Sequence, residues 1–182
     1  MRAALLSLWF EEDAAIPRTK WWKRDAAFDS AITSFLPLTE ALIAAPPPAP
    51  EPSLSLDDAA LADILATDQV PRNAHRGTAR AFEGDATALR LARAAVASGV
   101  LSRLASEHAR LFVLMPFMHS EDPAAHEEVA PLWPDGMTFA HEHAEVVRKF
   151  SRFPHRNALL GRESTEEEVA HLASAERKSW EQ

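Results

Sequence analysis

The chain has 182 residues, a length that suits one domain with a hydrophobic core and is short for two. Hydrophobic residues make up 47% and charged residues 25%, which excludes wholesale disorder. The net charge of −8 argues against a nucleic-acid partner, and the lack of Cys excludes disulfides and cysteine nucleophiles.

Residue types favour helices throughout. Ala and Leu are abundant, β-branched residues are scarce, and only 5 Gly are available for hairpin turns. We therefore expect an all-α fold.

The first helices are predicted at residues 3–10, 25–35 and 38–45. A polar loop containing Pro17 follows the first helix, and Phe28, Ile32 and Phe35 share one face of the second. Pro37 is expected to interrupt the helix and redirect the chain. The N-terminal segment lacks a small-residue cleavage site, so we do not expect a signal peptide.

Residues 46–53 are rich in Pro and are expected to form a stiff, extended loop. The first 45 residues are too few for a separate core. We therefore interpret residues 1–182 as a single helical domain with this loop inside it.

Five further helices are expected in the rest of the chain, together with a short one at residues 123–129. The first runs from residue 56 to about 69, with Ser55 as its cap, Leu61, Ile64 and Leu65 buried, and Pro71 as its end. The next is capped by Thr78 and ends at Gly99. The others are expected at residues 102–115, at 136–150 and from Ser164 onward.

These elements amount to about eight antiparallel helices without a convincing strand. No apolar run approaches the roughly 20 residues that a membrane span needs, so we expect no membrane partner and a cytoplasmic location. The oligomeric state is left open.

Two polar segments resemble each other. In Asp68–Thr78 and in residues 153–165, Pro is expected to end a helix, an Arg-Asn pair follows, and a Gly and a hydroxyl residue precede the next helix.

Three segments carry a family resemblance: DQVPRNAHRGTARAFEGDA at 68–86, LFVLMPFMHSED at 111–122 and KFSRFPHRNALLGREST at 149–165. With Trp9-Phe10, Trp21-Trp22 and Phe28-Asp29 near the N-terminus, they make the chain resemble the bacterial domain-of-unknown-function family 924 over nearly its whole length. The resemblance implies a tetratricopeptide-like, right-handed helical superhelix and assigns no activity. Val70, Ala79 and Ser151 depart from the family pattern, in which Gly is usual at position 151.

The polar segments place an unusual number of Arg and Asn side chains in loops. They could bind a phosphate or carboxylate through guanidinium forks and helix N-termini. They could equally cap helix ends and pair with Asp68, Glu121, Asp122 and Glu163. Both interpretations stay open for the candidate ligand-binding residues Arg72, Asn73, Arg76, His119, Arg152, His155, Arg156, Asn157 and Arg162.

Other polar groups are weaker candidates. The spacing of His119, Glu121 and Asp122 matches no strong metal signature, and we expect no metal and no cofactor. His141 and His143 point to different sides of a helix, and we expect a solvated face there.

The leading hypothesis is a pocket for a small anionic molecule or an acidic peptide terminus. One alternative is an enzyme of hydrolase or acid–base type at the same site, with His119 or His155 as acid–base and Asp68 or Glu121 orienting it. The other is a protein-interaction scaffold.

Overall fold

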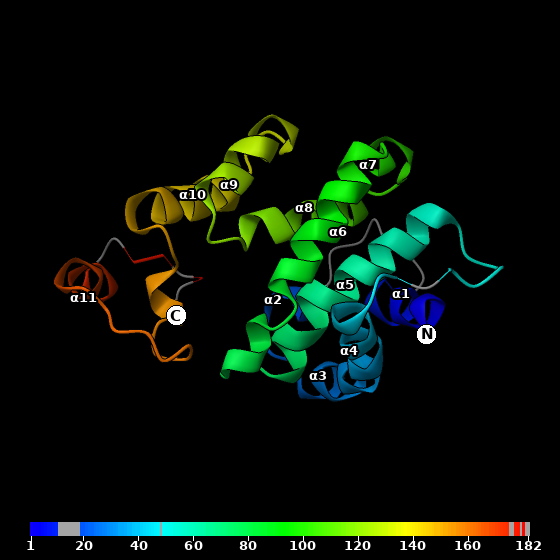
Figure 1. The fold of residues 1–182 in the computed structure, drawn as a ribbon, viewed down its shortest axis with the longest axis horizontal. Helices are drawn as coiled ribbons and strands as arrows, with labels where there is room; N and C mark the ends of the chain where they lie inside the picture. The colour runs from blue at the N-terminus through cyan, green and yellow to red at the C-terminus, as the bar shows by residue number, and fades with distance from the viewer. Residues whose placement is uncertain (11–18, 48, 175–176, 179, 181–182) are drawn as a thin grey trace. The chain divides into compact units, whose positions relative to one another are not determined.

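The computed structural model describes residues 1–10, 19–47, 49–174, 177–178 and 180 (Figure 1). Within these ranges every regular element is an α-helix or a short 3₁₀-helix, which confirms the all-α class. The chain divides into two compact units, Met1–Pro116 and Phe117–Gln182. That they form a single domain, and that the helices form a right-handed superhelix, stay predictions. The predicted loop around Pro17 lies outside the described residues.

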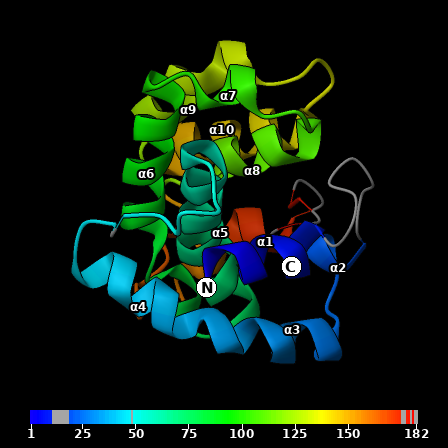
Figure 2. The ribbon, with the colours of Figure 1, turned by 90° about the vertical axis from the view of Figure 1, so that its right-hand side faces the viewer.

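The first unit is built around one long helix, α5 (Leu56–Ala74), which packs against α1, α3, α4 and α6 (Figure 2). The elements before α5 are α1 (Arg2–Phe10), α2 (Thr19–Trp22), α3 (Ala26–Ile32), the 3₁₀-helix η1 (Thr33–Phe35) and α4 (Leu36–Ala44). Those that follow it are η2 (Ala79–Phe82), α6 (Asp85–Ala97), α7 (Val100–Arg103) and α8 (Glu107–Met118). Because α5 is surrounded, Ile64, Leu65 and Val70 are fully buried.

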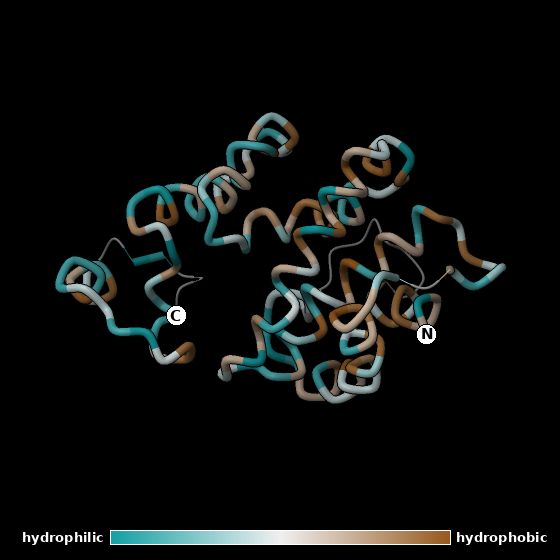
Figure 3. The backbone as a smooth tube through the Cα atoms, viewed as in Figure 1, coloured by the Kyte–Doolittle hydropathy of each residue, from teal (hydrophilic) through white to brown (hydrophobic). Residues whose placement is uncertain are grey.

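The stretch Ala26–Ala44 corrects two expectations. Pro37 lies in the first turn of α4, where a missing N–H costs nothing, and the irregular turn is η1 instead. By length and composition alone this stretch could cross a membrane, so the chain does contain an apolar run of nearly that length. Polar residues interrupt it (Figure 3), and Phe28, Ile32 and Phe35 are buried, although only about a third of the stretch is.

Helix α5 does not end at Pro71, contrary to the prediction. It begins at the Ser55 cap, as expected, and continues through Pro71 to Ala74. Proline leaves the carbonyl four residues earlier, that of Thr67, without its helical hydrogen bond. Gly84 packs directly over this carbonyl, where a Cβ atom would lie only 1.9 Å from the oxygen. The absence of a side chain at residue 84 therefore lets the chain approach α5 next to its proline.

Two further boundaries differ from the prediction and one agrees with it. The Thr78 hydroxyl donates to the carbonyl of His75 and does not cap a helix. The 3₁₀-helix η2 lies between Thr78 and α6. Gly99 ends α6 in the left-handed region, as predicted. The helix expected at 102–115 is split into α7 and α8, and Pro116 lies inside α8.

The second unit contains the end of α8, α9 (Pro123–Val129), η3 (Ala130–Leu132), α10 (Thr138–Phe150), η4 (Pro154–Arg156) and α11 (Glu166–Ala173). The side chains of Val146, Val147 and Phe153 form a core cluster against which Phe150 and Trp180 pack. Helix α10 ends at Ser151, whose φ of 56° is left-handed, which explains why Gly suits this position. The capping box of α11 is present, with Thr165 and Glu168 as partners.

Candidate functional site

The predicted site residues belong to both units. Asp68, Arg72, Asn73 and Arg76 lie in the first, and the remaining candidates lie in the second. That the polar segments Asp68–Thr78 and 153–165 lie close together stays a prediction.

In the first unit, Arg72 is held between two carboxylates on different helices. One of its terminal nitrogens lies 3.1 Å from Asp68 and 2.7 Å from Asp85, and it also donates to the Asp68 carbonyl. Although burial opposes its charge, the two carboxylates raise the pKa of Arg72. This arrangement ties the end of α5 to the start of α6.

Asn73 and Arg76 make similar local links. The Asn73 amide donates to the carbonyl of Gln69, and its oxygen accepts from Arg76 at 2.7 Å. Arg76 also reaches Asp29 of α3 at 3.3 Å. Because Asn73 and Arg76 lie on the last turn of α5 and just beyond it, these contacts hold the helix end in place.

In the second unit, Arg162 grips Glu121 with both terminal nitrogens, at 2.6 and 2.9 Å. The same carboxylate accepts the backbone N–H of Phe153 at 2.8 Å. Burial opposes the charged carboxylate, but these hydrogen bonds and the nearby Arg156 outweigh it and lower the pKa of Glu121. Asp122, the other acid of that segment, instead caps α9.

Arg152 pairs with Glu168, which the sequence analysis did not single out. Their two hydrogen bonds are 2.6 and 2.7 Å long, and Arg152 also donates to the carbonyl of Glu163. The bond from Arg152 is the main cause that lowers the pKa of Glu168 to about 2. Asn157 is buried and donates to Ser164 and Glu168. The signal that could have located Glu168 is the capping box itself, since Glu at this position turns back toward the preceding loop.

Phe153 is the centre of a group that we call the Phe153 cluster: Phe153, Arg156, His143, His155 and Trp180. The Arg156 guanidinium lies 4.6 Å from the centre of the Phe153 ring, and the other three rings lie 5.6 to 5.7 Å from it. Trp180 stacks on His143 at 3.6 Å. Sequence patterns carried no signal for Trp180, which lies far along the chain from its partners.

The two histidines of this cluster are held in their neutral forms. Burial, followed by the charge of Arg156, lowers the pKa of His155 to about 3, and Arg177 and Arg162 act in the same direction. Glu121 is the carboxylate that opposes them. The buried Nδ1 atom of His155 has no hydrogen-bond partner among the described residues.

The prediction that His141 and His143 lie on a solvated helix face is wrong for His143. Its neighbour His141 is exposed, but His143 itself is only 8% exposed and donates from Nδ1 to the Phe139 carbonyl at 2.6 Å. Burial is the main cause that lowers its pKa to about 3. The ring of His119 lies 6.5 Å from that of His143.

No group of three or more His, Asp or Glu side chains that could hold a metal ion occurs among the described residues. That the protein uses neither metal nor cofactor stays a prediction.

Fold and site together define an all-α protein whose second unit carries a cluster of arginine, histidine and aromatic side chains. The chain belongs to the family described as "Bacterial protein of unknown function (DUF924)", whose model matches residues 5–176, and the resemblance inferred from the sequence is thereby confirmed. A solved structure of a protein of unknown function from Agrobacterium tumefaciens is similar, with 31% identity and a TM-score of 0.73. The match covers 94% of this chain and 96% of that one. No curated protein matches the chain.

Proposed function

We propose that the protein binds a small anion, a carboxylate or a phosphate, at the Phe153 cluster. The observation that carries this proposal is the buried Nδ1 atom of His155, which has no hydrogen-bond partner among the described residues. The charges of Arg156, Arg177 and Arg162 each lower the pKa of this half-buried imidazole, and that of Glu121 raises it. Positive charges near the imidazole would stabilise an anion bound to it.

Arg156 is the best placed of these side chains to contact the anion. Arg72, Arg152 and Arg162 are each committed to carboxylates in close ion pairs. The Arg156 guanidinium lies 4.6 Å from the centre of the Phe153 ring, and this aromatic face helps to fix its orientation beside His155. Of the nine candidate ligand-binding residues, we therefore retain Arg156 and its neighbours in the second unit.

His155 supplies the second contact. A neutral imidazole can carry its proton on Nδ1, and this buried atom lacks a hydrogen-bond partner among the described residues. An anion within reach would accept that hydrogen bond. It would also raise the pKa of His155, because a negative charge favours the imidazolium form.

The enzyme alternative, with His119 or His155 as acid–base, stays a prediction. His126 and His143 each use a ring nitrogen to donate to a backbone carbonyl, of Ser120 and Phe139 respectively, as structural histidines do. An anion-binding role needs no proton transfer from either ring.

The test compares sodium phosphate and sodium acetate with sodium chloride at matched ionic strength. We expect either phosphate or acetate to raise the melting temperature of the wild-type protein and of Arg90→Gln, an exposed charge in the first unit. Arg156→Gln should lose this response. Equal responses in all three proteins, or none beyond that to chloride, would overturn the proposal.

Arg156 is only 5% exposed, so we expect its replacement to lower stability by itself. A second measurement uses the wild type alone. In imidazole ¹H–¹⁵N spectra, the effective anion should shift the His155 resonances and leave those of the exposed His141 in place. Unmoved His155 resonances would count against the site even if the melting temperature rises.

A further inference from the structure

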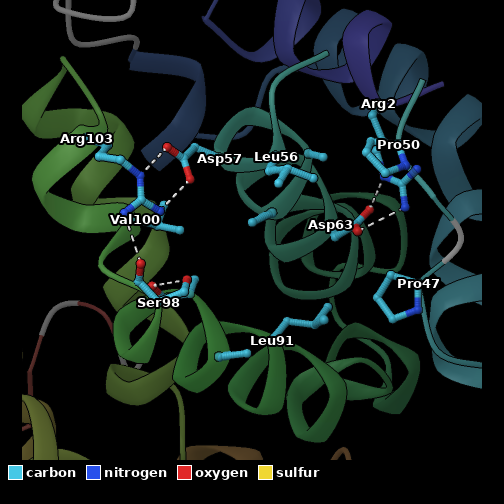
Figure 4. A pocket seen from close by; sticks show the side chains of 14 residues that line it. Arg2, Pro47, Pro50, Leu56, Asp57, Asp63, Leu91, Ser98, Val100 and Arg103 are labelled. Carbon is cyan, nitrogen blue, oxygen red and sulfur yellow. Dashed lines mark hydrogen bonds and ion pairs between the residues drawn. The ribbon is translucent and has the colours of Figure 1, made fainter. Parts of the chain in front are cut away.

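A groove of about 710 Å³ lies in the first unit, and none of the predicted site residues lines it (Figure 4). It runs between the start of α5 and the end of α6, and α7 and the Pro-rich loop border it. Its lining is predominantly apolar and includes Ala60, Ala94, Ala95, Leu56, Leu91 and Val100. Leu56 is 75% exposed, which is unusual for a leucine and places an apolar side chain at the edge of the groove.

The charges that border the groove are neutralised in pairs. On one side, Arg2 binds Asp63 through Nε and a terminal nitrogen, at 2.6 and 3.0 Å. On the other, Arg103 binds Asp57 in the same manner at 2.7 and 2.8 Å, and its remaining terminal nitrogen donates to the Ser98 carbonyl. Figure 4 shows the two pairs on opposite sides, with Leu56 and Leu91 between them. Because each guanidinium is neutralised by its carboxylate partner, neither pair favours a charged ligand.

The walls are preformed. Pro47 and Pro50 contribute from the loop, and their rings restrict the backbone. The alanines have no side-chain rotamers to order when a ligand binds. Arg2 also donates to the carbonyl of Ala49 at 3.4 Å, which holds the loop beside α5. Binding in this groove would therefore cost little conformational entropy.

We infer that this groove binds an uncharged, largely apolar small molecule. Its volume falls within the range of about 300 to 1,000 Å³ that is typical of small-molecule sites. The apolar lining provides the driving force, and the paired charges discriminate against ions. This site is independent of the anion site proposed in the second unit, and its ligand has the opposite character.

The test uses N-phenyl-1-naphthylamine, an uncharged dye whose fluorescence increases in apolar surroundings. We expect saturable binding of one dye per chain to the wild type. Ala94→Phe should fill the groove and weaken binding by at least tenfold. Ala97→Phe is the matched control, because Ala97 is exposed on the same helix and does not line the groove.

Three results would overturn the inference: no saturable dye signal, equal binding by the two variants, or an anionic naphthalene sulfonate dye that binds as tightly as the uncharged one. Circular dichroism melts of both variants check that the fold is intact. Since Ala94 is exposed, we expect both variants to melt close to the wild type.

Discussion

Two histidine side chains of the second unit, His143 and His155, lie in surroundings that oppose their protonation. His143 is stacked between the indole of Trp180 and the interior, and its Nδ1–H is fixed on a backbone carbonyl. His155 lies among arginines. Both are neutral for the same physical reasons, which are loss of water and an unfavourable neighbouring charge.

Stability should consequently fall in mild acid. An unfolded histidine titrates near pH 6.5, whereas the pKa of folded His143 is about 3. Between these values the unfolded chain binds a proton that the folded chain does not, so the free energy of unfolding is undiminished above about pH 6.5 and decreases as the pH falls toward 3. Each such histidine contributes a slope of up to about 1.4 kcal/mol per pH unit.

Urea unfolding at several pH values measures this slope. We expect His143→Gln to reduce the pH dependence of the free energy of unfolding by about the share that one bound proton contributes. His141→Gln, a change at the exposed neighbour, should leave this pH dependence unaltered. Identical slopes in the two variants would show that His143 is not the group responsible.

At the scale of elements, α5 shows how a helix passes through a proline. Pro71 leaves the Thr67 carbonyl without a helical partner, and Gly84 approaches that carbonyl more closely than any other residue type could. This contact joins α5 to the segment that leads into α6.

Gly84→Ala should therefore be strongly destabilising. The added methyl group would lie 1.9 Å from a backbone oxygen, so the chain must shift, and we expect a loss of about 3 kcal/mol or more in the free energy of unfolding. Gly77→Ala is the comparison, since Gly77 has a left-handed φ of 79° and nothing within 4 Å of the added carbon. It should cost about 1 kcal/mol, from backbone strain alone. If denaturant unfolding finds Gly84→Ala no costlier than Gly77→Ala, the proposed close contact is wrong.

Helix boundaries differ in how far they could be predicted. Ser55 and Thr165 cap α5 and α11 by bonding backbone groups three residues away, and such local chemistry is visible in sequence. Pro71 was wrongly expected to end α5, and the residue that packs on the carbonyl it leaves without a helical bond, Gly84, comes from the segment before α6.

At the scale of the whole molecule, the two units differ in their cores. The largest fully buried side chains of the first unit are aromatic and aliphatic: Trp9, Phe112, Leu5, Ile32, Leu42, Ile64, Leu65 and Val70. In the second unit they are Phe117, Phe153 and the charged Glu168. Among the described residues, the second unit thus has fewer large apolar side chains that are fully buried.

We expect the second unit to open first. Helices α6 and α10 each contain 13 residues, so their amide hydrogens can be compared without a difference in length. Hydrogen exchange should be at least about tenfold faster in α10 than in α6, because the smaller core makes local opening easier. Equal rates in both helices would mean that the protein opens as one cooperative unit.

The sequence by itself determined the helical class, most helix positions and the family. These depend on residue propensities, capping groups and apolar periodicity, all of which act over a few neighbouring residues. It also located the arginine-rich segments, but not the partners of their side chains.

Only the tertiary structure decided those partners. Arg162 meets Glu121 across 41 residues and Arg152 meets Glu168 across 16, and His143 finds its stacking partner in Trp180. The groove beside α5 likewise needs residues from α1, α5, α6 and α7 and from the Pro-rich loop. Such contacts depend on how distant segments pack together, and a local pattern carries no record of that packing.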